Sequence, residues 1–183
     1  MKGRRPLRRI IESTLLSLDG VIEDPATWVG DYLDADFQKG ALERLMESDA
    51  MLLGRRTYAL LARDLAAQTG DFAHRINSIR KYVFSSTLAR ADWNNSTIIK
   101  GDAVGEVRKL KEQAGASLAV YGHGLLARTL LKHGLLDEIR LSVFPLFVGR
   151  GQLFFGEGGT TKSRLLDATS LPTGVVVMRY RPI

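Results

Sequence analysis

Two segments of the sequence carry residues suited to binding a phosphate group. In Leu52–Thr57, and again in Val120–Leu125, a short apolar run ends in glycine and leads into a segment with helical content. Glycine allows a ligand to approach the backbone, and the first N–H groups of a helix lack partners within it, so an anion is favoured there. Arg55 and Arg56 add guanidinium groups that suit a phosphate, and Thr57 adds a hydroxyl donor.

A third apolar run ends in three consecutive hydroxyl side chains, Ser85, Ser86 and Thr87. Taken singly, each of the three segments is also typical of an ordinary turn, loop or solvated helix face. Together they favour a nucleotide site, because parallel strands open their carboxyl ends on one side of a sheet. The Gly122-His123-Gly124 turn lacks the third glycine and the later acid of a standard dinucleotide fingerprint, so a Rossmann domain is disfavoured.

Other chemistries are disfavoured by what the sequence lacks. It contains no cysteine, which excludes disulfides and thiolate sites and fits a reducing cytoplasm. The three histidines, His74, His123 and His133, lack the spacing of a metal pair, so no metal site is predicted. No Gly-x-Ser-x-Gly elbow of a serine hydrolase occurs.

Short apolar runs alternate with amphipathic segments along the chain, which predicts an α/β fold with a mainly parallel sheet covered on both faces. The last strands have no helix between them, so we expect an antiparallel edge at the C-terminal end. Strands are predicted at Leu7–Leu18, Ala50–Leu53, Lys81–Phe84, Thr97–Lys100, Leu118–Tyr121, Glu138–Pro145 and Val175–Tyr180, and helices at Ala35–Glu47, Arg56–Leu65, Ala103–Ala114 and Leu125–His133.

Length and charge indicate one globular domain. The chain has 183 residues and a formal net charge of +6, and five positive charges lie in its first nine residues. We therefore divide it into a basic tail over residues 1–8 and one domain over 9–183. Because the basicity belongs mainly to the tail, a nucleic-acid partner is disfavoured. No apolar run approaches the ~20 residues of a membrane-spanning helix, so no membrane partner is expected.

From about Arg9 to Pro182 the sequence resembles the dihydrofolate-reductase-like family, specifically relatives of the riboflavin-biosynthesis reductase domain, the C-terminal domain of RibD. Five motifs in order carry the resemblance. They are Ser17–Ile22, Leu52–Tyr58, Tyr82–Leu88, Val120–Gly124, and Gly134–Leu141 continued through Pro145, Gly149-Arg150-Gly151 and Leu153-Phe154. The resemblance implies a three-layer sandwich with a mainly parallel sheet and an antiparallel C-terminal edge.

The resemblance also implies NADPH as cofactor and assigns its contacts. The segment Gly54, Arg55, Arg56 and Thr57 would bind phosphates, with the arginines favouring the 2′-phosphate, and Ser85, Ser86 and Thr87 would hold the adenosine ribose phosphate. The turn of Gly122, His123, Gly124 and Leu125 would lie under the pyrophosphate. Asp19–Ile22, including Val21 and Ile22, resembles the loop that closes over the nicotinamide.

The implied reaction is hydride transfer to a small heterocycle, pterin-like or a ribosylaminopyrimidine. Trp28 resembles an aromatic residue on the substrate side, and Asp31, Asp19 and Asp34 are the candidate proton sources, of which Asp31 is preferred. Asp34 is also typical of a helix cap. The alternative hypothesis is a nucleotide-binding or regulatory module without turnover. Because the closing strands Leu141–Phe147 and Val175–Tyr180 would leave an apolar sheet edge, we expect a homodimer.

Overall fold

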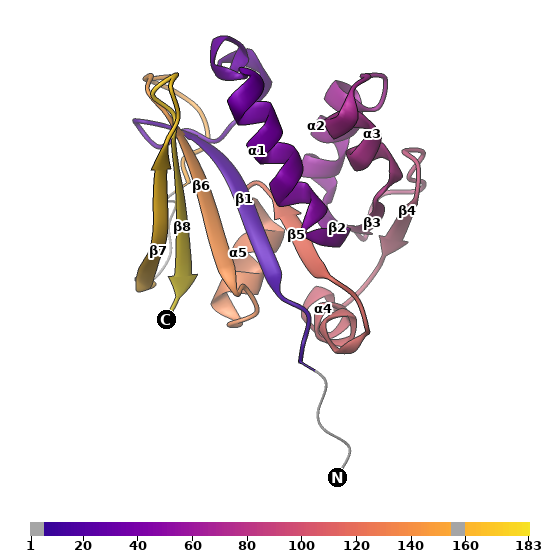
Figure 1. Cartoon of the computed structure of the whole chain (residues 1–183). Helices are drawn as coiled ribbons and strands as arrows, with labels where there is room; N and C mark the ends of the chain where they lie inside the picture. The colour runs from indigo at the N-terminus through magenta and orange to yellow at the C-terminus, as the bar shows by residue number, and fades with distance from the viewer. Residues whose placement is uncertain (1–5, 155–159) are drawn as a thin grey trace.

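The strands and helices alternate through most of the chain, and this alternation produces a sheet with a parallel centre (Figure 1). The structure is a computed structural model that describes residues 6–154 and 160–183. Within these residues the sheet has eight strands in the order β4-β3-β2-β5-β1-β6-β8-β7. The pairs from β4 to β6 are parallel, and β8 and β7 add an antiparallel edge, as expected from the sequence.

The element bounds follow the predicted ones closely, with two additions. The strands are β1 (Ile10–Ser17), β2 (Ser48–Gly54), β3 (Arg80–Phe84), β4 (Ser96–Ile99), β5 (Ser117–Tyr121), β6 (Glu138–Phe144), β7 (Ser163–Ser170) and β8 (Val176–Pro182). The helices are α1 (Ala35–Met46), α2 (Arg55–Leu65), α3 (Asp71–Ser78), α4 (Ala103–Glu112) and α5 (Leu125–Lys132), with 3-10 turns η1 (Pro25–Thr27) and η2 (Gly30–Tyr32).

The two additions are α3 and β7, which the sequence patterns did not predict. Helix α3 is only eight residues long, and β7 is exposed along its whole length, so it lacks the alternation of buried and exposed residues that marks a half-buried strand. Strand β7 pairs with β8 and forms the sheet edge. We expected the β6 and β8 segments to form an exposed apolar edge if nothing covered them; β6 lies inside the sheet and β7 covers β8, so β7 is the outermost strand on this side.

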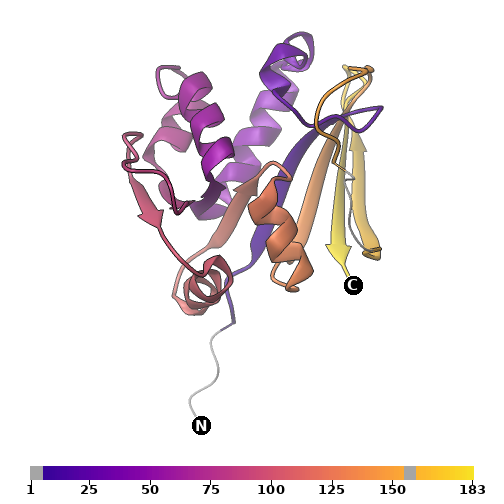
Figure 2. The same ribbon diagram turned by 180° about the vertical axis from the view of Figure 1, so that it is seen from behind.

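Helices cover both faces of the sheet, which makes the predicted three layers. Helices α1, α2 and α3 lie on one face, and α4 and α5 lie on the other, seen from behind in Figure 2. On the first face Met51 and Leu53 pack with Ile76, and on the second Leu52 packs with Leu130; all five side chains have no exposed surface. Alternate residues of β2 thus point into the two cores.

The parallel register brings the ends of four strands to one edge of the sheet. Gly54 of β2 pairs with Phe84 of β3, and the N–H of Gly122, just after β5, donates to the carbonyl of Ser13 in β1. The three phosphate-type segments predicted from the sequence begin at these strand ends. They lie on one side of the molecule because all the strands that carry them run in the same direction.

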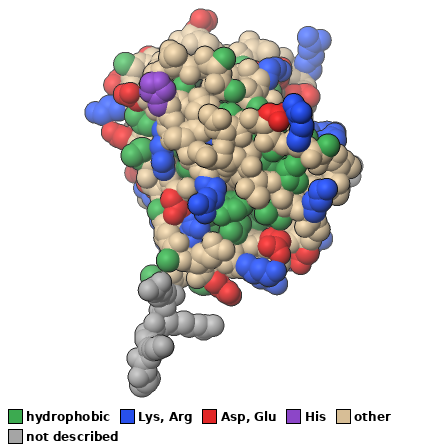
Figure 3. Space-filling view, turned by 90° about the vertical axis from the view of Figure 1, so that its right-hand side faces the viewer, with side chains coloured by type: hydrophobic (Ala, Val, Ile, Leu, Met, Phe, Trp, Pro, Cys, Tyr) green, Lys and Arg blue, Asp and Glu red, His purple; other side chains and the backbone are tan. Residues whose placement is uncertain are grey.

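At the N-terminal side, Arg8 belongs to the folded body rather than to a free tail. Its side chain is buried and bonds to the Asp49 carboxylate and the Ala116 carbonyl. The other basic tail residues, Lys2, Arg4 and Arg5, lie outside the described residues. On the face shown in Figure 3, Lys and Arg side chains are interspersed with Asp and Glu. Among the described residues, no helix is long and apolar enough to cross a membrane.

Candidate functional site

A cleft of about 1320 Å³ opens at the carboxyl ends of β1, β2, β3 and β5 and continues beneath α1. It is lined by twelve of the thirteen residues that the resemblance assigned to the cofactor. These are Ile22, Gly54, Arg55, Arg56, Thr57, Ser85, Ser86, Thr87, Gly122, His123, Gly124 and Leu125. The thirteenth, Val21, is buried in the core, where its N–H donates to the Ser17 hydroxyl.

The two glycine turns meet at Thr57, in the first turn of α2. A Cβ placed on either Gly122 or Gly124 would lie 3.9 Å from the Thr57 hydroxyl oxygen. Gly122 has a φ of +72°, a left-handed conformation that favours glycine. The turn after β2 and the turn after β5 therefore form one continuous wall, and the missing side chains leave backbone accessible to a ligand.

Helices α2 and α5 both begin at this wall without a side-chain cap. Their N-cap residues are Gly54 and Gly124, which have no side chain to accept a hydrogen bond from the first N–H groups. Beside them the Arg55 guanidinium donates to the Thr87 hydroxyl at 2.9 Å, which joins α2 to the segment after β3. Uncapped helix starts, an arginine and hydroxyl groups suit the phosphates of a dinucleotide.

His123 contributes to this wall mainly through its backbone, because its ring turns into the core. The ring Nδ1 lies 2.7 Å from the Glu12 carboxylate, and the ring stacks on Phe154 with centroids 4.1 Å apart. Glu12 has no exposed surface and also accepts a hydrogen bond from the Thr14 hydroxyl. A buried carboxylate on the central strand β1 thus holds the His123 ring inside the core.

The loop Asp19–Ile22 is tied to the segment after β6. Asp19 accepts hydrogen bonds from the Ser17 hydroxyl at 2.6 Å and from the N–H groups of Val148 and Gly149 at 3.1 and 2.6 Å. These bonds lower the pKa of Asp19 to about 2, the Ser17 hydroxyl having the largest effect. Such a carboxylate is a poor proton donor near neutral pH, so its role here is to position the loop.

The other three predicted catalytic residues, Asp34, Trp28 and Asp31, lie near the cleft but are not among the residues that line it. Asp34 caps α1 by accepting from the Phe37 N–H at 2.8 Å. Trp28 packs edge-on against Phe144 and donates from its indole N–H to the Glu23 carbonyl. Asp31 is exposed in η2, next to Gly30, which does line the cleft. Of the three carboxylates, Asp31 is thus the one with no hydrogen bond or ion pair among the described residues.

The inner part of the cleft contains polar residues that the sequence analysis did not single out. Arg44 lies on α1, Ser13 on β1, Tyr121 at the end of β5, and Arg140 and Ser142 on β6. Burial raises the pKa of Tyr121 to about 12, so its hydroxyl stays a neutral donor. Both faces of β6 are covered, so Arg140 and Ser142 are buried as well as Ile139 and Leu141, which the alternation of residues along the strand alone could not reveal.

Beneath these residues is a buried ion cluster centred on Glu138. Arg140 donates to both Glu138 and Glu47, and Arg179 and Arg9 also donate to Glu138. Burial alone would raise the pKa of Glu138, but the hydrogen bonds from Arg179 and Arg140 lower it to about 2. The cluster holds β6 and β8 in register at the lower end of the cleft floor.

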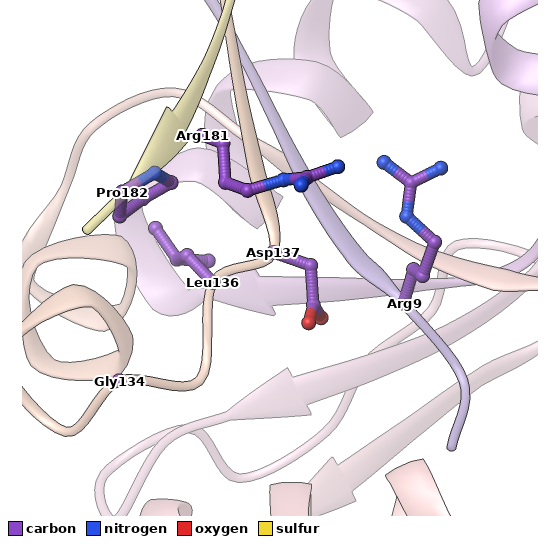
Figure 4. Close-up of a pocket in the computed structure, with 6 residues that line it drawn as sticks. All are labelled: Arg9, Gly134, Leu136, Asp137, Arg181 and Pro182. Carbon is purple, nitrogen blue, oxygen red and sulfur yellow. The ribbon is translucent and has the colours of Figure 1, made fainter. Parts of the chain in front are cut away.

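A second hollow, of about 390 Å³, lies at the opposite edge of the sheet (Figure 4). Figure 4 shows Arg9 and Arg181 above Asp137, whose carboxylate points away from both. That carboxylate accepts from the Ile10 N–H and the Lys111 ammonium, so it already fastens β1 to α4. Among the described residues no group of three or more His, Asp and Glu is arranged to hold a metal.

Comparison with known families agrees with this architecture. The model of the family described as RibD C-terminal domain matches residues 8–177. The chain belongs to this family. YyaP of Bacillus subtilis (strain 168), described as an uncharacterized protein, is 31% identical over an alignment of 179 positions that covers 94% of this chain and 94% of that one.

Solved structures related to the RibD C-terminal domain share the fold. A Shewanella sp. PV-4 protein named for riboflavin biosynthesis is 21% identical with a TM-score of 0.75, over 96% of this chain and 99% of that one. A diaminohydroxyphosphoribosylaminopyrimidine deaminase/5-amino-6-(5-phosphoribosylamino)uracil reductase from Thermotoga maritima is 14% identical with a TM-score of 0.67 and covers 97% of this chain and 57% of that one. The RibD match spans every predicted site residue, from Asp19 to Leu125.

Proposed function

We propose that this RibD-family protein is an NADPH-dependent reductase that transfers a hydride to a small heterocyclic substrate. The observation that carries the proposal is the convergence of two uncapped helix starts, the Arg55–Thr87 contact and the Thr57 hydroxyl on one wall of one cleft. At about 1320 Å³ the cleft exceeds the ~300–1,000 Å³ of a typical single-ligand pocket, so it has room for a dinucleotide and a substrate.

When bound, NADPH supplies the hydride. The protein's own residues bind and orient the cofactor and the substrate. The glycine turns and Arg55 and Arg56 hold phosphates, and the loop fixed by Asp19 closes the cleft beside Ile22. We assign the proton to Asp31 or a water that it orders, since Asp34 is used as a cap and the pKa of Asp19 is low.

The proposed substrate class is based on the activity for which a structural relative is named. The Thermotoga protein is named as a reductase of a phosphoribosylaminouracil, and this supports a pyrimidine or pterin-like heterocycle. We further propose that the protein is cytoplasmic and that it forms a homodimer through β7, the strand at the sheet edge, where Leu165 and Leu166 are exposed.

The cofactor is tested by thermal unfolding with NADPH, NADH or no ligand, for the wild type and for Arg55→Ala and Arg56→Ala. A ligand that binds only the native state raises stability, by about 2.7 kcal/mol at a hundredfold excess over its dissociation constant. We expect a shift with NADPH that each variant weakens by about 1.5–3 kcal/mol in binding free energy, with little change for NADH.

Arg108→Ala is the matched control, because Arg108 is an exposed arginine on α4, outside the cleft lining. Equal shifts with NADPH and NADH would contradict the 2′-phosphate assignment. No shift with either ligand would remove the cofactor proposal. A shift without turnover of dihydrofolate or 5-amino-6-(5-phosphoribosylamino)uracil would favour the nucleotide-binding module instead.

A further inference from the structure

The inner half of the cleft holds an arginine that forms no hydrogen bond or ion pair with the described residues. Arg44 is half-buried on α1, lines the cleft, and has its guanidinium 5.9 Å from the centre of the Phe37 ring. Burial is the main cause that lowers its pKa. A buried or half-buried charge normally has a partner, because its desolvation is otherwise uncompensated.

The carboxylate best placed to pair with Arg44 is already engaged. Glu47, one turn further along the chain, gives both carboxylate oxygens to Arg140, at 2.9 and 2.7 Å. Arg140 also bonds to Glu138, so this second arginine of the cleft is fully paired. No hydrogen bond or ion pair to Arg44 occurs among the described residues, and the positive charge of Arg44 is therefore available to a ligand.

The helix itself makes room for this guanidinium. A Cβ added to Gly40 would lie 2.8 Å from an Arg44 terminal nitrogen, so the arginine folds back over Gly40. Glycine inside a helix is unfavourable relative to alanine. The absence of a side chain at Gly40 thus leaves the space that the Arg44 guanidinium occupies along the cleft wall.

Neutral hydroxyl donors surround the same space. Tyr121 and Arg44 are electrostatic neighbours, and the hydroxyl of Tyr121 stays protonated to about pH 12. Ser13 and Ser142 line the cleft from β1 and β6. The described acidic residues of the lining lie on the loop after β1 and on α2 and α3, and none lies on a strand of the floor; they are Glu23, Asp24, Asp64 and Asp71.

We propose that the inner half of the cleft binds an oxyanion of the substrate, a carboxylate or a phosphate, through Arg44 and Tyr121. A guanidinium can form paired hydrogen bonds to either group, and the phenol adds a third donor. A floor with donors and no carboxylate would oppose a cationic heterocycle. This inference rests on the proposed function for its location in a substrate site, and it names the chemical class of that substrate.

The test uses three aromatic probes that differ in their head group. Binding of benzoate, phenyl phosphate and the neutral benzamide is measured by calorimetry on the full-length protein, with and without saturating NADPH. Under the proposed function NADPH occupies the wall formed by the turns after β2 and β5, which we call the phosphate wall. Its presence then blocks phosphate binding at Arg55 and Arg56. We expect at least one anion to bind about tenfold or more tightly than benzamide, and whichever anion does so identifies the oxyanion.

Two variants separate the site from general effects of folding. Arg44→Gln removes the charge, and Gly40→Ala keeps the charge but displaces the guanidinium while favouring the helix. Arg44→Gln should abolish or strongly reduce the preference for the anion. Gly40→Ala should weaken the preference less, because the guanidinium lies at the end of a flexible side chain and can shift, and it should not lower the unfolding temperature. Lys39→Gln, which removes an exposed charge from the same helix, should leave the preference unchanged.

The outcomes distinguish this inference from the proposed function. Equal binding of anions and benzamide, or a preference that survives in Arg44→Gln, would overturn the oxyanion site whatever NADPH does. An anion preference lost in Arg44→Gln, in a protein that shows no NADPH-induced stabilisation, would keep the site and remove the reductase proposal. NADPH-induced stabilisation without an anion preference would keep the reductase proposal and remove the oxyanion site.

Discussion

At the scale of single residues, the carboxylates near the cleft have separate uses. Asp34 caps a helix, Asp19 fixes a loop, and Glu12 holds the ring of His123. Each of these bonds restricts the carboxylate to one geometry. Asp31 has no such bond among the described residues, and this freedom makes it the most suitable of the three candidates to exchange a proton with a substrate or an ordered water.

We therefore predict that Asp31→Asn lowers turnover of dihydrofolate or the phosphoribosylaminouracil, whichever is reduced, by about 10²–10⁴-fold. Asp36→Asn, on an exposed residue in the first turn of α1, is the control. Unchanged turnover in Asp31→Asn would show that the proton comes from elsewhere.

At the scale of elements, the phosphate wall depends on how two strands pass into two helices. Gly122 and Gly124 are two residues apart, and an added Cβ on either would have the same nearest atom, the Thr57 hydroxyl, at 3.9 Å. Their backbones differ, because Gly122 has a φ of +72° and Gly124 a φ of −77°. Replacing each glycine by alanine therefore separates the effect of the added methyl group, which both positions share, from the effect of backbone strain, which only Gly122 has.

Gly122→Ala should lower the free energy of unfolding by about 1–2 kcal/mol, since an L-residue in the left-handed region is strained, while Gly124→Ala should lower it much less. Both should weaken NADPH binding, because each places a methyl group on the phosphate wall. Urea unfolding and NADPH titration measure the two effects. Equal losses of stability would mean that packing, and not φ, determines the cost.

At the scale of the whole molecule, ion pairs fasten the antiparallel edge to the parallel centre. Glu138 lies between Arg140, Arg179 and Arg9, which come from β6, β8 and the start of β1. Its pKa is about 2 in the folded protein against an ordinary value of 4.5. Its contribution to stability is therefore present above pH 4.5 and is lost as the pH falls from 4.5 towards 2.

We predict that Glu138→Gln is less stable than the wild type at pH 7 and that this difference shrinks between pH 4.5 and 2. Urea unfolding at a series of pH values measures it. Glu106→Gln, which removes an exposed carboxylate paired with Lys109 on α4, should change the pH dependence far less. A difference that stays constant with pH would place the effect in packing rather than in charge.

The exposed edge at β7 leads to a prediction about assembly. An edge strand with exposed Leu165 and Leu166 is a surface that a second copy can cover. Light scattering should report the mass of a dimer for the wild type, and Leu165→Lys should shift it towards the monomer. A monomeric wild type at micromolar concentration would refute the proposed homodimer.

The sequence by itself determined the fold class and the place where the proposed phosphate-binding segments come together. Alternating apolar runs and helices predict a covered parallel sheet, and parallel strands necessarily bring Gly54, Ser85 and Gly122 to one edge. These are local signals, since a strand, its terminal glycine and the helix that follows are contiguous in the chain. The resemblance to the RibD domain added the order of the motifs, and the family match confirmed this resemblance.

Only the tertiary structure decided the inner half of the cleft. Arg44, Tyr121 and Arg140 are far apart in the sequence and carry no motif, and they come together because α1 packs on the face of the sheet that carries Tyr121 and Arg140. Whether Arg44 or Arg140 has a free charge depends on which of them Glu47 reaches. Such pairing is set by the packing of separate elements, which no periodicity along the chain encodes.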